Sequence, residues 1–215
     1  MAHGVEVALL NFPAGDVAHG ERGYVNDESR REEAERGFTD ALELAVTIGA
    51  PNLNLLVGRA LPGVSEERQR AAVLAALRSF APIAATAGVR ILLEPLNASE
   101  NPGFLAPTPD AAAALIEAVG SDALGLLLDV YHVACAGEDP AGAIARHGEL
   151  IGHVQVADHP GRGAPGSGSL ACWEILEALA ASGYDGAVGF EYDARGETER
   201  SLGFLREPRA ASLLG

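Results

Sequence analysis

Residues 89–97 of the chain have the sequence VRILLEPLN, and residues 124–132 have the sequence LGLLLDVYH. Each stretch begins as a nearly unbroken apolar run and continues to a carboxylate, Glu94 in the first and Asp129 in the second. A strand that is apolar along its length is typical of a parallel sheet, because helices cover both faces of such a sheet. The two stretches therefore predict an α/β fold with acidic residues at strand ends.

The same kind of short apolar run recurs along the chain and alternates with longer segments of helical composition. The pattern predicts six strands, at residues 5–12, 53–58, 89–97, 124–132, 151–158 and 187–192. Strands that alternate with helices in this way are typical of successive β/α units in a parallel sheet. We therefore expect about six such units.

The segments between the strands carry signals for the ends of helices. Ser65, Thr108 and Asp139 precede acidic residues or a proline, as N-cap residues commonly do. Three glycines occupy places where helices would end, namely Gly49, Gly88 and Gly120. The Gly- and Pro-rich residues 160–168 are expected to form a loop over a site and not a linker, so residues 1–215 should form one domain.

A (β/α)8 TIM barrel is the leading architecture for these units. The glycine patterns of dinucleotide-binding folds and of P-loops are absent from the sequence. A closed barrel needs eight strands and typically about 250 residues. We therefore expect an incomplete barrel that lacks the first two β/α units, an open curved sheet with residues 5–12 at one exposed edge. An unprotected edge of this kind favours self-association into homo-oligomers.

Composition excludes several classes of protein. The formal net charge is −15, from 15 basic and 30 acidic residues, and this argues against binding to nucleic acid. Cys135 and Cys172 form no paired motif, so we expect neither a disulfide framework nor a zinc cluster, which fits the cytoplasm. The N-terminus has no signal-like pattern, and no apolar run approaches the roughly 20 residues of a membrane span. We expect a cytoplasmic protein without membrane contact.

Four residues with side-chain oxygen atoms lie near the ends of successive predicted strands. They are Glu94, Asp129, Gln155 and Glu191. In a TIM barrel the carboxyl ends of the strands form the active-site face, so these side chains should converge. Oxygen ligands of this kind suit a hard divalent cation such as Mg²⁺ or Mn²⁺. The alternative is that each acid caps a helix or pairs with an arginine at the rim of the barrel.

Several motifs occur at these strand ends in a fixed order. They are LNFPAGD at 10–16, GERG at 20–23, EPLN at 94–97, DVYH at 129–132, GHVQVAD at 152–158, PGR at 160–162, GYDG at 183–186 and EY at 191–192. With these motifs the chain resembles the hydroxypyruvate isomerase family, which belongs to the xylose-isomerase-like barrels of sugar phosphate isomerases and epimerases. The resemblance extends over about residues 5–205.

The resemblance implies roles for particular residues. Glu94 and Glu191 would be the two catalytic carboxylates, and Asp129 and Gln155 would complete a divalent-metal site with them. His132 would contact the substrate, a small hydroxy-oxo acid. The chemistry requires a proton to leave one carbon and return to its neighbour through an enediolate, whose charge a metal can stabilise.

Three further residues are candidates for substrate binding. His153 lies two positions before Gln155 and therefore shares its face of the strand, either as a contact to the substrate or as a supporting core histidine. Arg22 and Arg162 lie in expected loops, where they are either solvated charges or clamps for a substrate carboxylate. The family usually has His after PGR, whereas this chain has Gly163, and this difference bears on the choice of substrate.

The favoured function is an isomerase that interconverts hydroxypyruvate and tartronate semialdehyde, or acts on a related 2-oxo-tetronate. A ketose 3-epimerase of the same superfamily is an alternative, but such enzymes typically have His where this chain has Gln155. A second alternative is a catalytically silent barrel fragment that retains the site residues by descent.

Overall fold

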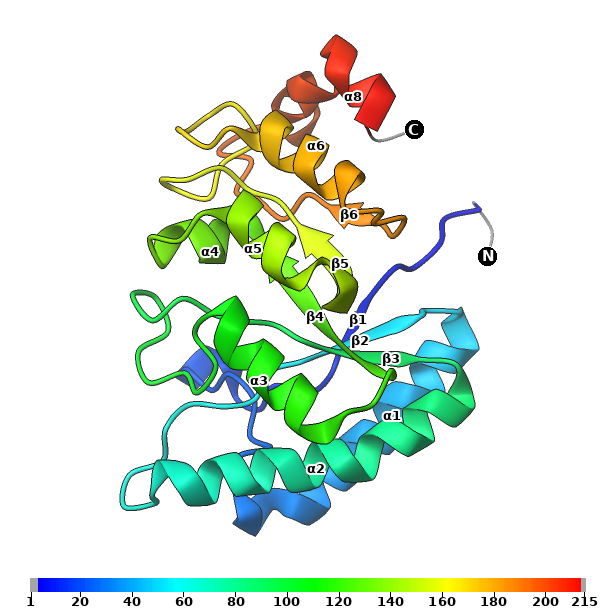
Figure 1. Cartoon of the computed structure of the whole chain (residues 1–215), viewed down its shortest axis with the longest axis vertical. Helices are drawn as coiled ribbons and strands as arrows, with labels where there is room; N and C mark the ends of the chain where they lie inside the picture. The colour runs from blue at the N-terminus through cyan, green and yellow to red at the C-terminus, as the bar shows by residue number, and fades with distance from the viewer. Residues whose placement is uncertain (1–3, 214–215) are drawn as a thin grey trace.

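The computed structural model describes residues 4–213, which fold around one parallel β-sheet (Figure 1). The strands follow one another in the sheet in chain order, and every neighbouring pair is parallel. The strands are β1 (Leu10–Asn11), β2 (Asn52–Leu55), β3 (Arg90–Leu93), β4 (Leu124–Asp129), β5 (Ile151–Gln155) and β6 (Val188–Gly189). The prediction of six parallel β/α units is confirmed.

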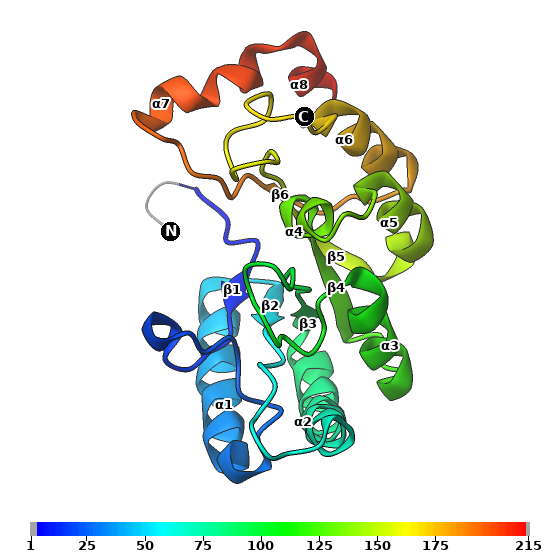
Figure 2. The ribbon, with the colours of Figure 1, turned by 90° about the vertical axis from the view of Figure 1, so that its left-hand side faces the viewer.

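Helices follow the strands and cover the outer side of the sheet, which curves into an open half-barrel (Figure 2). The α-helices are α1 (Arg31–Ile48), α2 (Glu66–Ala87), α3 (Pro109–Val119), α4 (Val130–Cys135), α5 (Pro140–His147), α6 (Cys172–Ala181), α7 (Thr198–Ser201) and α8 (Pro208–Leu213). Short 3-10 helices are η1 (Val17–His19), η2 (Glu28–Arg30), η3 (Gly148–Leu150) and η4 (Leu202–Arg206). The expectation of an incomplete TIM barrel is confirmed.

The predicted helix ends are also confirmed. The side chains of Ser65, Thr108 and Asp139 each accept a hydrogen bond from a backbone N–H in the first turn of α2, α3 and α5. Gly49 and Gly88 follow α1 and α2 in the left-handed conformation, and their N–H groups bond to the last turn of the helix. These caps satisfy backbone groups that the helix itself leaves without partners.

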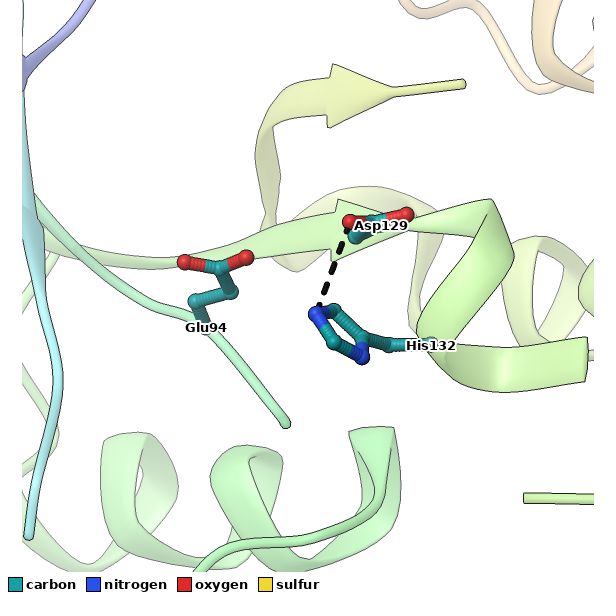
Figure 3. Close-up of side chains that lie close together, drawn as sticks. All are labelled: Glu94, Asp129 and His132. Carbon is teal, nitrogen blue, oxygen red and sulfur yellow. Dashed lines mark ion pairs between the residues drawn. The ribbon is translucent and has the colours of Figure 1, made fainter. Parts of the chain in front are cut away.

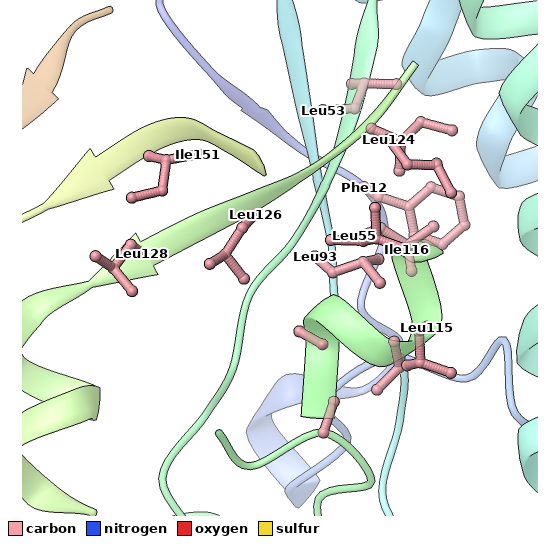
Figure 4. Close-up of a cluster of buried hydrophobic side chains, with 14 of the residues drawn as sticks. Phe12, Leu53, Leu55, Leu93, Leu115, Ile116, Leu124, Leu126, Leu128 and Ile151 are labelled. Atoms are coloured by element: carbon pink, nitrogen blue, oxygen red, sulfur yellow. The ribbon is translucent and has the colours of Figure 1, made fainter. Parts of the chain in front are cut away.

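The hydrophobic core lies between the sheet and the outer helices (Figure 4). Alternate residues of the central strands belong to it, among them Leu53, Leu55, Ile91, Leu93, Leu126 and Leu128. Phe38 of α1 stacks on Phe80 of α2 with 4.3 Å between ring centroids. Because successive strand residues point to opposite faces, Asn54, Leu92 and Leu127 face the inside of the half-barrel. The polar residues that follow on this inner face form the candidate site.

The strands are shorter than the sequence predicts, and the physical reason differs between them. β1 and β6 keep only two residues each because they lie at the edges of the sheet and pair on one side only. β3 ends at Leu93, just before Glu94 and Pro95, and a proline cannot donate a hydrogen bond to a neighbouring strand. The extension of the fourth strand to residue 132 was wrong, because residues 130–132 are the first turn of α4.

The position of the first strand at a sheet edge is confirmed. Val5, just upstream of it, is 65% exposed. The self-association expected from this edge stays a prediction. Within residues 4–213, the helices that are long enough to cross a bilayer are not apolar enough to do so.

Candidate active site

A cavity of about 510 Å³ lies at the carboxyl ends of the strands. Six of the residues predicted from the sequence line it, namely Arg22, Glu94, His132, Gln155, Arg162 and Glu191. Asp129 adjoins this group, because one oxygen or nitrogen atom each of Glu94, Asp129 and His132 lie within 4.8 Å of one another (Figure 3). His153 is buried but is not among the residues that line the cavity.

Glu94 and Asp129 are buried carboxyls on neighbouring strands, with 8% and 2% of their surfaces exposed. Burial raises the pKa of Glu94 to about 8, and the nearby charge of Asp129 adds to this shift. Burial also raises the pKa of Asp129 to about 7, against the opposing effect of the Arg162 guanidinium. Both groups are therefore costly to ionise together unless a cation lies beside them.

Asn54 of β2 supports Glu94 from the neighbouring strand. Its Nδ2 donates a hydrogen bond to Glu94 Oε2 at 2.6 Å, and this bond favours the ionised carboxylate. Asn54 is buried, and it points inward between Leu53 and Leu55, which point to the core. Sequence reasoning missed this residue, although a polar residue at the inward position of the segment NLNL was the available signal.

Arg162 pairs with two of the three carboxyl groups that form the acidic cluster of the site, Glu94, Asp129 and Glu191. Its Nη2 lies 3.1 Å from Asp129 Oδ2 and 3.2 Å from Glu191 Oε2. These carboxylates raise the pKa of Arg162 against the effect of burial, so the guanidinium stays charged. The sequence interpretation of Arg162 as a clamp for the substrate carboxylate remains a prediction. In this structure the guanidinium pairs with two carboxylates of the protein itself.

Gln155 and Glu191 complete the set predicted to hold a metal. Gln155 is paired in register with Asp129, and its buried Oε1 has no hydrogen-bond partner among the described residues. Glu191 lies two residues beyond β6, and 55% of its side chain is exposed. A divalent cation would satisfy the unpaired amide oxygen and offset the buried carboxylates. The donor set therefore fits a hard cation such as Mg²⁺ or Mn²⁺.

The hydrogen bonds around His132 define which ring nitrogen carries the proton. Asn97 Nδ2 lies 2.6 Å from His132 Nδ1, and the orientation of this amide is fixed because its Oδ1 accepts bonds from Ser99 Oγ and the Glu100 N–H. Nδ1 is therefore the acceptor, and the proton of the neutral ring is on Nε2. Burial lowers the pKa of His132 to about 4, with a further contribution from Arg162.

The Nε2 atom of His132 lies 3.7 Å from Asp129 Oδ2 and 3.4 Å from Arg162 Nη1. Since both Nε2 and Nη1 carry hydrogen, the second contact joins two donors and is not a hydrogen bond. The Nε2–H is thus held among the polar groups of the site without a close acceptor of its own. This neutral N–H group is therefore available as a hydrogen-bond donor.

Arg22 and His153 differ in what surrounds them. The Nε atom of Arg22 donates to Asn101 Oδ1 at 3.1 Å. His153 lies next to Gly189 of β6, and its buried Nδ1 has no partner in the described part of the chain. The position of His153 away from the cavity lining agrees better with a supporting residue than with a contact to the substrate.

Comparison with known protein families gives the class of this protein. Residues 1–207 match the family model described as "Xylose isomerase-like TIM barrel". The chain belongs to this family.

Within the family, the chain is 34% identical to the hydroxypyruvate isomerase of Escherichia coli, over 94% of this chain and 78% of that protein. It is also 34% identical to the 2-oxo-tetronate isomerase of Cupriavidus necator, over 95% of this chain and 79% of that protein. A solved structure titled AP endonuclease, family 2 from Brucella melitensis has a TM-score of 0.91 and 30% identity, over 95% of this chain and 79% of that one.

Proposed function

We propose that this protein is an aldose–ketose type isomerase that interconverts hydroxypyruvate and tartronate semialdehyde, or acts on a closely related 2-oxo-tetronate. The observation that carries the proposal is that Glu94 and Glu191 line the same cavity from different strands, next to the buried carboxyl of Asp129. The names of the two relatives from E. coli and C. necator support this substrate class.

The reaction moves one proton between neighbouring carbon atoms. A carboxylate removes a proton from C3 of hydroxypyruvate, and the electron pair of the broken C–H bond forms the C2–C3 double bond of an enediolate. A proton then adds to C2, and the hydroxyl proton of the C3 oxygen passes to the C2 oxygen. The C3 oxygen becomes the carbonyl oxygen of an aldehyde, which yields tartronate semialdehyde. Glu94 and Glu191 would share these two transfers, since general acid and base groups must both reach the substrate.

A divalent cation, Mg²⁺ or Mn²⁺, would be held by Glu94, Asp129, Gln155 and Glu191. When bound, it stabilises the negative charge that develops on the substrate oxygens. Arg162 pairs with the carboxyl groups of Asp129 and Glu191 and would orient them. The Nε2–H of His132, fixed by Asn97, would donate a hydrogen bond to a substrate oxygen.

A ketose 3-epimerase would use the same carboxylates and the same kind of proton transfer on a neutral sugar. The amide of Gln155, where such epimerases typically have an imidazole, favours the isomerase. A silent barrel fragment would retain these residues without turnover. The two alternatives predict different results in one assay.

The test is an assay of the purified chain with hydroxypyruvate, a 2-oxo-tetronate and a neutral ketohexose, after dialysis against a chelator and with Mg²⁺ or Mn²⁺ added back. We expect conversion of hydroxypyruvate or the tetronate that depends on the added ion. Epimerisation of the ketohexose alone would favour the alternative enzyme. The absence of turnover with every substrate and ion would reject an enzymatic role for this chain.

A further inference from the structure

Two arginines outside the acidic cluster converge on one amide oxygen in the cavity wall. Arg22 Nε donates to Asn101 Oδ1 at 3.1 Å, and Arg59 Nη2 donates to the same oxygen at 3.4 Å. Arg22 follows β1, Arg59 follows β2, and the buried Asn101 follows β3. Arg22 and Asn101 line the 510 Å³ cavity, while Arg22 and Arg59 line an adjoining hollow of about 300 Å³. Two positive charges thus meet at a neutral acceptor beside the candidate active site.

Neither guanidinium has an acidic partner in the part of the chain that the structure describes. Within residues 4–213, no ion pair joins Arg22 or Arg59 to a carboxylate, although the chain carries a net charge of −15. Arg59 Nε is moreover buried and has no hydrogen-bond partner in this part of the chain. A buried donor without a partner is costly and is uncommon away from functional sites. Arg22 Nη1 donates to the backbone carbonyl oxygens of Val17 at 3.3 Å and Glu21 at 2.7 Å, so the donor left to Arg22 among the described residues is Nη2. Arg59 keeps Nε and Nη1, and the charge of both guanidiniums is uncompensated.

The backbone holds Arg59 in this place. Its carbonyl oxygen accepts a hydrogen bond from Asn26 Nδ2 at 2.7 Å, and Arg59 forms an antiparallel bridge with Phe104. Ala60 N–H donates to the carbonyl oxygen of Gly103 at 2.7 Å, so the loops after β2 and β3 are bonded directly to each other. Because the fold already orders the Arg59 backbone, binding of an anion there costs less conformational entropy.

We propose that Arg22, Arg59 and Asn101 form an anchor for the carboxylate of the substrate. The inference rests on the proposed function and narrows it, because it selects an anionic hydroxy-oxo acid over a neutral ketose. The remaining charged wall of the cavity is acidic, and Arg162, the other arginine in the lining, already neutralises Asp129 and Glu191. A substrate carboxylate is repelled by that wall and attracted by the two guanidiniums that lack an acidic partner, whose remaining N–H groups can donate charge-assisted hydrogen bonds to it.

The kinetic test compares Arg59→Gln and Arg22→Gln with the wild type and with Arg206→Gln, an exposed arginine on η4 that controls for the loss of one charge. The substrates are hydroxypyruvate and dihydroxyacetone, in which a hydroxymethyl group replaces the carboxylate. For each anchor variant we expect KM for hydroxypyruvate to rise about 10- to 100-fold, and much more than KM for dihydroxyacetone. Equal changes for both substrates, or a wild-type KM for hydroxypyruvate in both variants, would overturn the anchor.

A binding measurement separates failure of the anchor from failure of the proposed function. Titration calorimetry with D-glycerate, which has the carboxylate but cannot undergo the reaction, should show binding to the wild type and to Arg206→Gln. Binding should be about 10-fold or more weaker in Arg59→Gln, and glycerol should not bind. A wild type that binds glycerate through Arg59 but turns over no substrate would refute the isomerase and retain the anchor. The anchor would be refuted if the wild type binds no glycerate, or if both anchor variants bind glycerate as tightly as the wild type. Either result would refute it even if hydroxypyruvate is isomerised.

Discussion

Glu94 and Glu191 line the same cavity from two very different parts of the sheet. Glu94 follows β3, a central strand with neighbours on both sides, whereas Glu191 follows the two-residue edge strand β6. The residue Glu94 is 8% exposed, whereas the side chain of Glu191 is 55% exposed. Burial, with the nearby charge of Asp129, therefore makes Glu94 a carboxyl that resists ionisation, while Glu191 pairs with Arg162 and stays open to water.

The difference extends to the elements around each carboxylate. Long helices, α1 and α2, pack beneath the central strands and supply the stacked pair Phe38 and Phe80. After β6, the described residues up to 213 form only the short helices α7, η4 and α8. The molecule thus places a buried carboxyl with a raised pKa at the end of a central strand and the accessible carboxyl at the edge of the sheet.

The largest expected effect is on turnover. In the presence of Mg²⁺, Glu94→Gln and Glu191→Gln should each lower kcat for hydroxypyruvate by about 10²- to 10⁴-fold, because the amide keeps the shape of the side chain but cannot carry the proton. Glu117→Gln, an exposed position on the outer helix α3, is the matched control. Near-normal turnover in either site variant would remove that residue from the catalytic pair.

The second expected effect is on the pH dependence of stability, and it should distinguish Glu94 from Glu191. The pKa of Glu94 is about 8 and that of Asp129 about 7 in the folded protein, well above their values of about 4 in an unfolded chain. A carboxyl with a raised folded-state pKa contributes its stability at low pH and loses it as the pH rises through that pKa. In metal-free protein, the free energy of unfolding should therefore fall by a few kcal/mol between about pH 4 and pH 8.

Urea denaturation at several pH values measures this slope. Glu94→Gln should flatten it, whereas Glu191→Gln should leave it nearly as steep. Added Mg²⁺ should stabilise the wild type more at pH 8 than at pH 5, because the ion competes with protons for the carboxylates. Identical slopes in the two variants would remove the contrast between a buried and an open carboxylate.

A smaller effect is expected at Asn97. Asn97→Asp places an acceptor opposite His132 Nδ1, which should draw the ring proton to Nδ1 and leave Nε2 without hydrogen, or make the ring cationic. We expect about a 10-fold loss in kcat, below the roughly 10²- to 10⁴-fold typical of a group that transfers the proton itself, because His132 would donate only a hydrogen bond. Nitrogen-15 NMR of the histidine rings checks the cause. An unchanged tautomer of His132 in the variant would show that Asn97 does not set it.

The smallest expected effect concerns local opening. Hydrogen exchange should be slowest in β3 and β4, close to the free energy of global unfolding, and about 1–3 kcal/mol less protected in β6. The reason is that β6 has a strand neighbour on one side only. Equal protection in the two regions would mean that the edge is as firmly held as the centre.

Much of this architecture could be predicted from local patterns in the sequence. Apolar runs located all six strands, and the residues Ser65, Thr108 and Asp139 marked the helices they cap, because these signals act over a few neighbouring residues. The lengths of β1 and β6 could not be predicted, because they depend on which strands lie at an edge. The places of Glu94 and Glu191 at the ends of predicted strands also indicated that the two side chains face one cavity, and both line it.

The supporting residues of the site were beyond local reasoning. Asn54 reaches Glu94 from the neighbouring strand, and Arg59 reaches Asn101 because the loops after β2 and β3 pair through their backbones. The pairing of Arg162 with Asp129 likewise spans 33 positions in the chain. Partners and burial of this kind exist only in the folded molecule, and they determine the charge and orientation of the groups that the sequence identifies.

Proton exchange in deuterated water tests most directly whether Glu94 and Glu191 share the two proton transfers. NMR would follow hydroxypyruvate with Mg²⁺, in the wild type, in Glu94→Gln and Glu191→Gln, and in a blank without protein. The account predicts that the wild type forms tartronate semialdehyde with deuterium at C2. One variant should still exchange the C3 hydrogens without forming product, and the other should lose both reactions. Product formation at the wild-type rate in both variants, or a wild type that exchanges and converts no faster than the blank, would contradict proton transfer by this pair.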